Sequence, residues 1–209
     1  MSRIEVPSTK SSLLRLRSNL SFLEVGRELL EQKRDVLSES LLTLHRDGVE
    51  ARRRVEARLS EAYEVLGAAH AALGRDGVER AALAAAPCPG PRVRERSLMG
   101  VVVPVVQLEE APAAHPLVAT PGERGAAADE TAVRLQALVP ALAELAELET
   151  SCERLANELA RTQRKLNALE LLHIPAHRAT IRFIADQLEE RDREGLFQLK
   201  RVKSSARTR

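Results

Sequence analysis

The chain has 209 residues and is dominated by leucine, alanine, arginine and glutamate, a composition typical of long helices and coiled coils. Only 2% of the residues are aromatic and tryptophan is absent, so the side chains that anchor a globular core or stack on nucleic-acid bases are scarce. Charged residues make up 30% of the chain and nearly cancel, at a net charge of +2, which favours neither nucleic acid nor an anionic membrane. We therefore do not expect a globular enzyme.

The N-terminal part, residues 1–80, predicts one long helix. Ser8 or Thr9, directly after Pro7, can cap its first turn. Leucines then recur at alternating spacings of three and four, which is the period of a coiled-coil seam. We assign six of them to this seam: Leu16, Leu20, Leu23, Leu30, Leu37 and Leu41. The repeat continues to Leu73, and Gly74 with Gly77 is the expected stop.

The middle part, residues 81–128, holds most of the prolines and predicts an irregular connection. Its run of β-branched residues from Val101 to Val106 is typical of a short strand or β-hairpin. One of the two cysteines, Cys88, lies here, and the other, Cys152, lies in the next helical repeat. Two cysteines in this arrangement indicate neither a disulfide framework nor a metal site, so we expect both thiols to be reduced.

The C-terminal part, residues 129–209, predicts a second long helix and a basic tail. Its seam includes Leu155, Leu159, Leu166 and Leu169. Two such seams in one chain bury each other most simply as an antiparallel two-helix coiled coil. The predicted fold class is therefore all-α, and its irregular middle segment can hold a short β-hairpin. Pro175 removes the hydrogen bond to the carbonyl of Leu171, so we expect a helix kink at that point.

A search for chemistry finds no catalytic residues and no cofactor site. Neither a GxxxxGK[ST] loop nor a GxGxxG turn is present. His173 and His177 have the spacing of two metal ligands on one helix face, with Glu170 before them. A third strong ligand is not evident, and Pro175 distorts the helix between the two histidines. We therefore interpret them as ordinary histidines and predict no metal site.

Local basic character leaves a second function open. The tail from Lys200 to Arg209 carries five basic residues and no acidic one, a pattern that can bind phosphate backbones. A free-standing coiled-coil adaptor that binds nucleic acid through this tail is therefore one alternative. An enzyme built on a helical scaffold is another, although no active site supports it.

Charged residues interrupt the first 25 positions, so we expect no signal peptide. The longest uncharged stretches contain prolines and are shorter than the roughly 18 residues that a membrane-spanning helix needs. We therefore expect a cytoplasmic chain. The excess of arginine over lysine suggests a GC-rich bacterial or archaeal genome, and of these two we expect a bacterial source.

Motifs at the two ends of the chain resemble one family. The segment from Thr162 to Lys203 is similar to the C-terminal signature of the D subunit of the V-type and archaeal-type rotary ATPases. Residues 7–10, Gly26 and Lys33 to Leu37 are similar to the N-terminal signature of the same family. The motifs that carry the C-terminal resemblance are Asn167-Ala168-Leu169-Glu170, Ile174-Pro175, Thr180-Ile181-Arg182-Phe183-Ile184 and Phe197-Gln198-Leu199-Lys200.

The resemblance implies a noncatalytic central rotor shaft that transmits torque in an ATP synthase. Its implied partners are the catalytic head of three A and three B subunits, the F subunit of the rotor, and a socket subunit called C or d. The socket joins the shaft to the membrane ring that moves protons or sodium ions, so the membrane contact is indirect and no nucleic acid is expected. The implied place is the cytoplasmic side of the membrane, peripheral to it. The residues expected to contact the head are Arg164, Lys165, Arg191 and Arg193.

Overall fold

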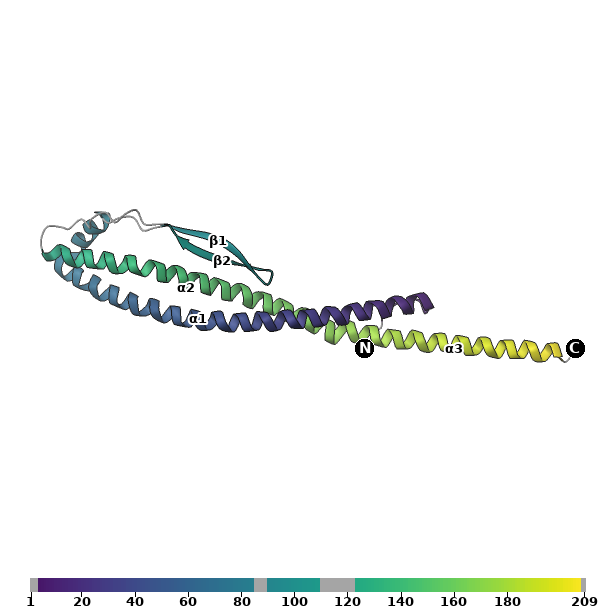
Figure 1. Ribbon diagram of the computed structural model, residues 1–209. Coiled ribbons are helices and arrows are strands. Elements are labelled where there is room, and N and C mark those ends of the chain that lie inside the picture. The colour runs from purple at the N-terminus through teal and green to yellow at the C-terminus, as the bar shows by residue number, and fades with distance from the viewer. Residues whose placement is uncertain (1–3, 85–89, 110–122, 208–209) are drawn as a thin grey trace. The chain divides into compact units, whose positions relative to one another are not determined.

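The structure is a computed structural model, in which residues 4–84, 90–109 and 123–207 are described. In chain order, two long helical segments lie before and after a two-stranded hairpin. The elements are α1 (Lys10–Ala84), β1 (Pro91–Leu98), β2 (Val101–Leu108), α2 (Glu123–Ala168), the π-helix η1 (Leu169–His173) and α3 (Ile174–Arg207). The hairpin runs beside α2 in Figure 1. The prediction of an all-α fold with a long helix pair and a short β-hairpin is confirmed.

Contacts divide the chain into two compact units. Unit 1 combines Met1–Val36 with Leu159–Arg209, and unit 2 is Leu37–Glu158. The helix α1 therefore contributes its first part to unit 1 and the remainder to unit 2, and α2 is likewise shared between the units. Each unit has its own pairing between the early and the late helical segments.

In unit 1, α1 runs antiparallel to α3. Glu24 forms an ion pair with Arg178 at 2.7 Å, and the ammonium of Lys10 lies 4.0 Å from the carboxylate of Asp192. The residue number on α1 falls as the number on α3 rises, which defines the antiparallel direction. The chain ahead of α1 also lies on α3, because the amide of Ile4 donates to the hydroxyl of Thr180 at 3.1 Å.

The start of α1 is capped by Thr9. The backbone N–H of Ser12 donates to the Thr9 hydroxyl oxygen at 3.1 Å, and the Thr9 hydroxyl donates to Ser12 Oγ at 2.9 Å. This satisfies one of the amides that the first helical turn leaves without an intrahelical partner. Of the two residues expected at this cap, Thr9 provides the side chain, and Ser8 instead offers its carbonyl oxygen to Arg191 at 2.9 Å.

In unit 2, α1 runs antiparallel to α2. Arg54 pairs with Glu144 at 2.8 Å, and Arg134 pairs with Glu61 at 3.2 Å. Between these exposed ion pairs lies an apolar core, in which Val55, Leu138 and Ala141 are buried and Leu59 and Leu145 are half-buried. Exposed ion pairs contribute little to stability, so the apolar contacts hold this helix pair together.

All ten leucines assigned to the seam are at least half-buried. Leu37 and Leu155 are 0% exposed, Leu166 is 1% exposed and Leu16 is 3% exposed. The half-buried members are Leu20, Leu23, Leu30, Leu41, Leu159 and Leu169. The leucine spacing therefore places these side chains on the inner face of each helix.

Two helix boundaries differ from the expected ones. Gly74 has φ 70° and ψ 173°, which is not helical, but a further helical stretch follows it and α1 ends at Ala84. A glycine adopts such a positive φ without steric cost, so it interrupts the helix as expected, although it does not end it. The later helix already begins at Glu123, ahead of Asp129, because the alanines before Asp129 are strong helix formers.

The expected disturbance before Pro175 takes the form of a π-helix. In η1, the amide of Ile174 donates to the carbonyl of Leu169, five residues earlier, in place of the four of an α-helix. Pro175 follows directly and has no amide to donate. In a regular helix the proline ring clashes with the carbonyl four residues earlier, and the wider turn lies in the stretch that holds this carbonyl. The size of any kink at Pro175 stays a prediction.

The π-helix also corrects the register of the seam. Two heptads after Leu169 comes Phe183, which is 36% exposed, whereas the next residue, Ile184, is 0% exposed. Ile174 is 6% exposed although His173 holds the position one heptad after Leu166. The sequence therefore contains one residue too many for a constant heptad, and the π-turn takes up that residue so that the apolar face of α3 still meets α1.

Truncation of a seam leucine tests the burial assignment. We expect Leu16→Ala to lower the free energy of unfolding by about 2 to 5 kcal/mol, because it removes buried methyl groups and leaves a cavity. Leu14→Ala, two residues earlier and 66% exposed, is the matched control and is expected to change it by less than about 0.5 kcal/mol. Chemical denaturation followed by circular dichroism measures both; equal losses would contradict the assignment.

Deletion of one residue tests the register correction. Removal of His173 together with Pro175→Ala restores a constant heptad without the proline clash, so we expect a continuous α-helix and a thermal midpoint at least as high as that of the chain with Pro175→Ala alone. Removal of Asn157, an exposed residue in the regular part of α2, shifts the seam out of phase and is expected to lower the midpoint. The explanation fails if both deletions lower the midpoint to the same extent.

Candidate interaction surfaces

The β-hairpin is a regular two-stranded ladder with a tight turn. Its antiparallel register runs from the pair Pro91 and Leu108 to the pair Leu98 and Val101. The turn residues Met99 and Gly100 have φ values of 52° and 80°. Two consecutive positive φ values match the twist of the flanking strands, which explains why glycine occupies the second position.

The second strand is attached to α2 by its backbone. The amide of Val106 donates to the carboxylate of Glu147 at 2.9 Å, and Arg154 donates to the carbonyl oxygen of Val102 at 2.8 Å. Val103 is 1% exposed. In unit 2, β2 is therefore the inner strand of the hairpin and β1 the outer strand, as Figure 1 shows.

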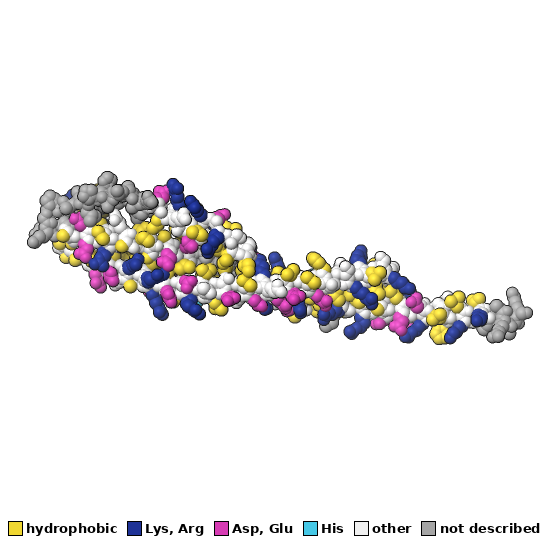
Figure 2. Space-filling view, in the orientation of Figure 1, with side chains coloured by type: hydrophobic (Ala, Val, Ile, Leu, Met, Phe, Trp, Pro, Cys, Tyr) yellow, Lys and Arg dark blue, Asp and Glu magenta, His cyan; other side chains and the backbone are white. Residues whose placement is uncertain are grey.

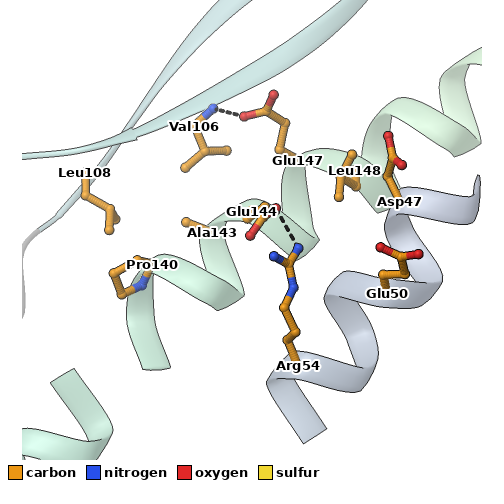
Figure 3. Close-up of a pocket in the computed structure, with 10 residues that line it drawn as sticks. All are labelled: Asp47, Glu50, Arg54, Val106, Leu108, Pro140, Ala143, Glu144, Glu147 and Leu148. Carbon is orange, nitrogen blue, oxygen red and sulfur yellow. Dashed lines mark hydrogen bonds and ion pairs between the residues drawn. The ribbon is translucent and has the colours of Figure 1, made fainter. Parts of the chain in front are cut away.

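An open groove of about 680 Å³ lies between β2, α1 and α2 (Figure 3). Its apolar lining consists of Val106, Leu108, Pro140, Ala143 and Leu148, and its acidic rim of Asp47, Glu50, Glu144 and Glu147. Two of these carboxylates are engaged, Glu144 by Arg54 and Glu147 by the amide of Val106. The groove offers an apolar floor and negative charge, a combination suited to contact with another chain.

The one cysteine in the described part of the chain, Cys152, is half-buried and free. Burial raises the pKa of its thiol, and the nearby carboxylates of Asp47 and Glu149 raise it further. The thiol is therefore neutral at neutral pH and is a poor nucleophile. Cys88 lies outside the described residues.

A second, smaller groove of about 420 Å³ lies beside the π-helix in unit 1. Ile174 and Pro175 form part of its lining, together with the ion pair between Arg178 and Glu24. One ring nitrogen of His177 beside it is engaged by a hydrogen bond to the carbonyl oxygen of His173 at 2.8 Å. Within residues 4–84, 90–109 and 123–207, no three potential metal ligands come together.

The four basic residues expected to contact the catalytic head are all exposed in unit 1. Arg191 donates to the carbonyl of Ser8 at 2.9 Å, and Arg193 pairs with Glu189 at 2.7 Å. Arg164 donates to the carbonyl of Ala160 on its own helix at 3.2 Å. Arg191 thus has a partner ahead of α1 and Arg193 one on its own helix, and a contact of the four residues with other subunits stays a prediction.

The last turns of α3 carry exposed apolar side chains that the sequence reasoning missed. Leu196 is 61% exposed, Phe197 72% and Leu199 68%. These residues follow Asp192, which lies beside the start of α1, so α3 continues past the end of its partner helix. The available signal was Phe197, one of only three phenylalanines in the chain.

No helix in the described ranges has both the length and the apolar character needed to span a membrane. The fold and the surfaces together define a class of protein, namely a long antiparallel coiled coil that carries a docked β-hairpin and an uncovered apolar helix end.

Comparison with known proteins identifies the family within this class. The sequence profile of the family of ATP synthase D subunits matches residues 12–204. The D subunit of the A-type ATP synthase of Pyrococcus furiosus is 33% identical over 208 residues, which covers 96% of this chain and 94% of the relative. Its counterpart in Methanopyrus kandleri is 34% identical over 199 residues, or 95% of this chain and 86% of the relative. The chain belongs to the family of D subunits of the A- and V-type ATPases, as its terminal motifs predicted.

These relatives come from archaea, and so does the D subunit of Thermococcus sibiricus, which is 33% identical over 98% of this chain and 96% of its own length. They give no support to the bacterial source that we expected. Arginine enrichment reports genome composition, which archaea and bacteria share, so it could not separate the two.

Removal of one carboxylate tests how the hairpin is attached. In Glu147→Ala, the amide of Val106 loses its acceptor on α2, so we expect its hydrogen exchange to become faster and the hairpin to be less protected as a whole. Glu153→Ala, an exposed change on the same helix, is the control and is expected to leave that amide unchanged. Residue-resolved hydrogen exchange measures both; equal exchange at Val106 in the two variants would refute the attachment.

Proposed function

We propose that this chain is the noncatalytic central rotor shaft of an A-type ATP synthase. In this role it transmits torque between a catalytic head of three A and three B subunits and the membrane ring that moves protons or sodium ions. Family membership supports the place of this chain in an ATP synthase complex. The observation in the structure that supports a shaft is the leucine seam that α1 makes with α2 in unit 2 and with α3 in unit 1.

A packed seam suits the transmission of torque. Twisting one helix about the other would expose buried side chains such as Leu37, Leu155 and Leu166, at a cost that rises with the apolar area exposed. An isolated helix has no such resistance from a partner. Paired helices with an apolar seam are therefore stiffer in torsion than either helix alone.

The uncovered end of α3 is the surface that we propose enters the head. Leu196, Phe197 and Leu199 are exposed there and are followed by basic residues such as Lys200. Exposed apolar side chains at the end of a helix favour a protein environment over water. Arg164 and Lys165 on α2 would contact acidic or carbonyl groups of the head farther along the shaft.

The other partners in this proposal are the F subunit of the rotor and a socket subunit, called C or d, that joins the shaft to the membrane ring. The chain itself then lies on the cytoplasmic side of the membrane, peripheral to it, and binds neither nucleotide nor nucleic acid. The alternative, a free-standing adaptor that binds nucleic acid through residues 200–209, predicts binding in isolation with a steep dependence on salt.

Assembly separates these two functions. The chain is co-expressed with candidate A, B and F subunits, and the complex is analysed by size-exclusion chromatography and an ATPase assay. We expect one copy to join three A and three B subunits and to sustain turnover. A chain that stays outside the complex, or that binds nucleic acid alone, would contradict the shaft function.

Neutralisation of the expected contacts tests the head interface. We expect Arg164→Gln with Lys165→Gln to lower the coupling between ATP hydrolysis and ion transport several-fold while the helix content of the isolated chain stays the same, because exposed charges add little to folding. Arg53→Gln, an exposed arginine on α1 in unit 2, is the control. Unchanged coupling in the double variant would remove these two residues from the interface.

A further inference from the structure

The two edges of the β-hairpin differ in how their backbone groups are satisfied. The edge of β2 is closed by α2, because Glu147 accepts from the amide of Val106 and Arg154 donates to the carbonyl of Val102. The opposite edge belongs to β1, which is the outer strand of a two-stranded sheet. An exposed strand edge presents unpaired amides and carbonyls in a fixed row and is a template for an additional strand.

The register shows which backbone groups of β1 point outward. The amide of Glu109 donates to the carbonyl of Gly90 at 3.1 Å, so this pair is hydrogen-bonded, and bonded pairs alternate with non-bonded pairs along an antiparallel ladder. The pair of Val93 and Val106 lies three steps farther along and is therefore non-bonded, in agreement with the amide of Val106 donating to α2. The outward amides on β1 are accordingly those of Val93, Glu95 and Ser97.

The side chains along β1 are exposed and mainly basic. Seven of the eight residues of this strand are exposed, and only Leu98 is half-buried. Arg92, Arg94 and Arg96 alternate along it, and Arg92 already pairs with Glu109 at 2.6 Å. Basic side chains gather over the hairpin in Figure 2. Beside them, Val93 is 63% exposed and offers an apolar contact on the other face of the strand.

We propose that the open edge of β1 binds an extended acidic segment of another subunit by strand addition. The outward amides of Val93, Glu95 and Ser97 supply the backbone hydrogen bonds, and Arg94 and Arg96 select carboxylates on the added strand. Cross-strand pairs of opposite charge stabilise a ladder and pairs of like charge destabilise it, so the occupant carries acidic residues at alternating positions. This inference rests on the proposed assembly into a rotary ATPase.

A second copy of the chain does not fit the same edge. If two β1 strands paired antiparallel about Glu95, Glu95 would face Glu95 and Arg94 would face Arg96 of the other copy. Like charges directly opposite each other destabilise a ladder, which is how natural proteins prevent pairing between identical edges. The charge pattern therefore disfavours self-pairing and leaves an acidic partner strand as the complement.

Hydrogen exchange at single residues tests strand addition in the assembled complex of this chain with the A, B, F and socket subunits. In the free chain, the outward amides of Val93, Glu95 and Ser97 should exchange quickly, whereas those of Arg94 and Arg96 are already bonded to β2. In the complex we expect the three outward amides to slow at least tenfold. If the complex forms and they exchange as in the free chain, the inference is overturned while the proposed function stands.

A matched pair of variants at one position adds a second test. Glu95→Pro removes an outward amide that β2 does not use, and proline is tolerated at such edge positions. Glu95→Ala keeps the amide and is the control. We expect protection of Val93 and Ser97 in the complex to persist with alanine and to be lost with proline. The amide of Arg96 reports whether the hairpin remains folded in both variants.

The nature of the occupant is tested by binding to the free chain. A synthetic peptide with alternating glutamate and valine should protect the outward amides, whereas its lysine and valine counterpart should not. Protection by anionic lipid vesicles or by duplex DNA, without protection by the acidic peptide, would overturn the assignment of a protein strand. Those ligands bind through the arginine side chains and do not need the outward amides and carbonyls of β1.

Discussion

The apolar seam between antiparallel helices is the constraint on which the rest of the structure depends. The chain has few aromatic residues, and among the described residues side chains such as Leu37, Leu155 and Ile184 are fully buried along the seam. The seam needs a constant phase between the two partners. The π-helix Leu169–His173 preserves that phase where the sequence carries one additional residue.

The surfaces available to other subunits follow from what the seam leaves uncovered. In unit 1, α3 runs past the start of α1, and Leu196, Phe197 and Leu199 are exposed in this stretch. In unit 2, α2 holds one edge of the hairpin through Glu147 and Arg154 and leaves the other edge open. The proposed function as a shaft in contact with several subunits requires surfaces of this kind, separate from the buried seam.

Leucine spacing was sufficient to predict the helix pair, its antiparallel direction and the side chains that face inward, because burial in a coiled coil follows the heptad directly. Pro175 indicated a disturbance but not its form. Whether the helix bends or forms a wider turn depends on the heptad phase before and after the proline. The structure shows this change of phase, because Phe183 is exposed and Ile184 is buried. The end expected at Gly74 was displaced because a further helical stretch follows this glycine, and the start expected near Asp129 was displaced because the alanines ahead of it favour a helix.

The contact surfaces were less accessible to sequence reasoning. Arg191 and Arg193 were expected to contact the head from the family resemblance and their charge, yet the structure gives them partners in the chain, Ser8 and Glu189. The β-branched run predicted a strand but could not reveal which edge α2 would cover. That depends on Glu147 and Arg154, which lie far along the chain from the strand and have no local signature.

The central claim is that this chain turns inside a catalytic head and carries torque. The most direct measurement attaches a bead to Met99→Cys, at the exposed hairpin turn, in a chain whose native cysteines are replaced by serine, and immobilises the reassembled head on a surface. We predict steady rotation of the bead in one direction when ATP is supplied. A head that hydrolyses ATP in the presence of the bound chain while the bead remains stationary would contradict the account.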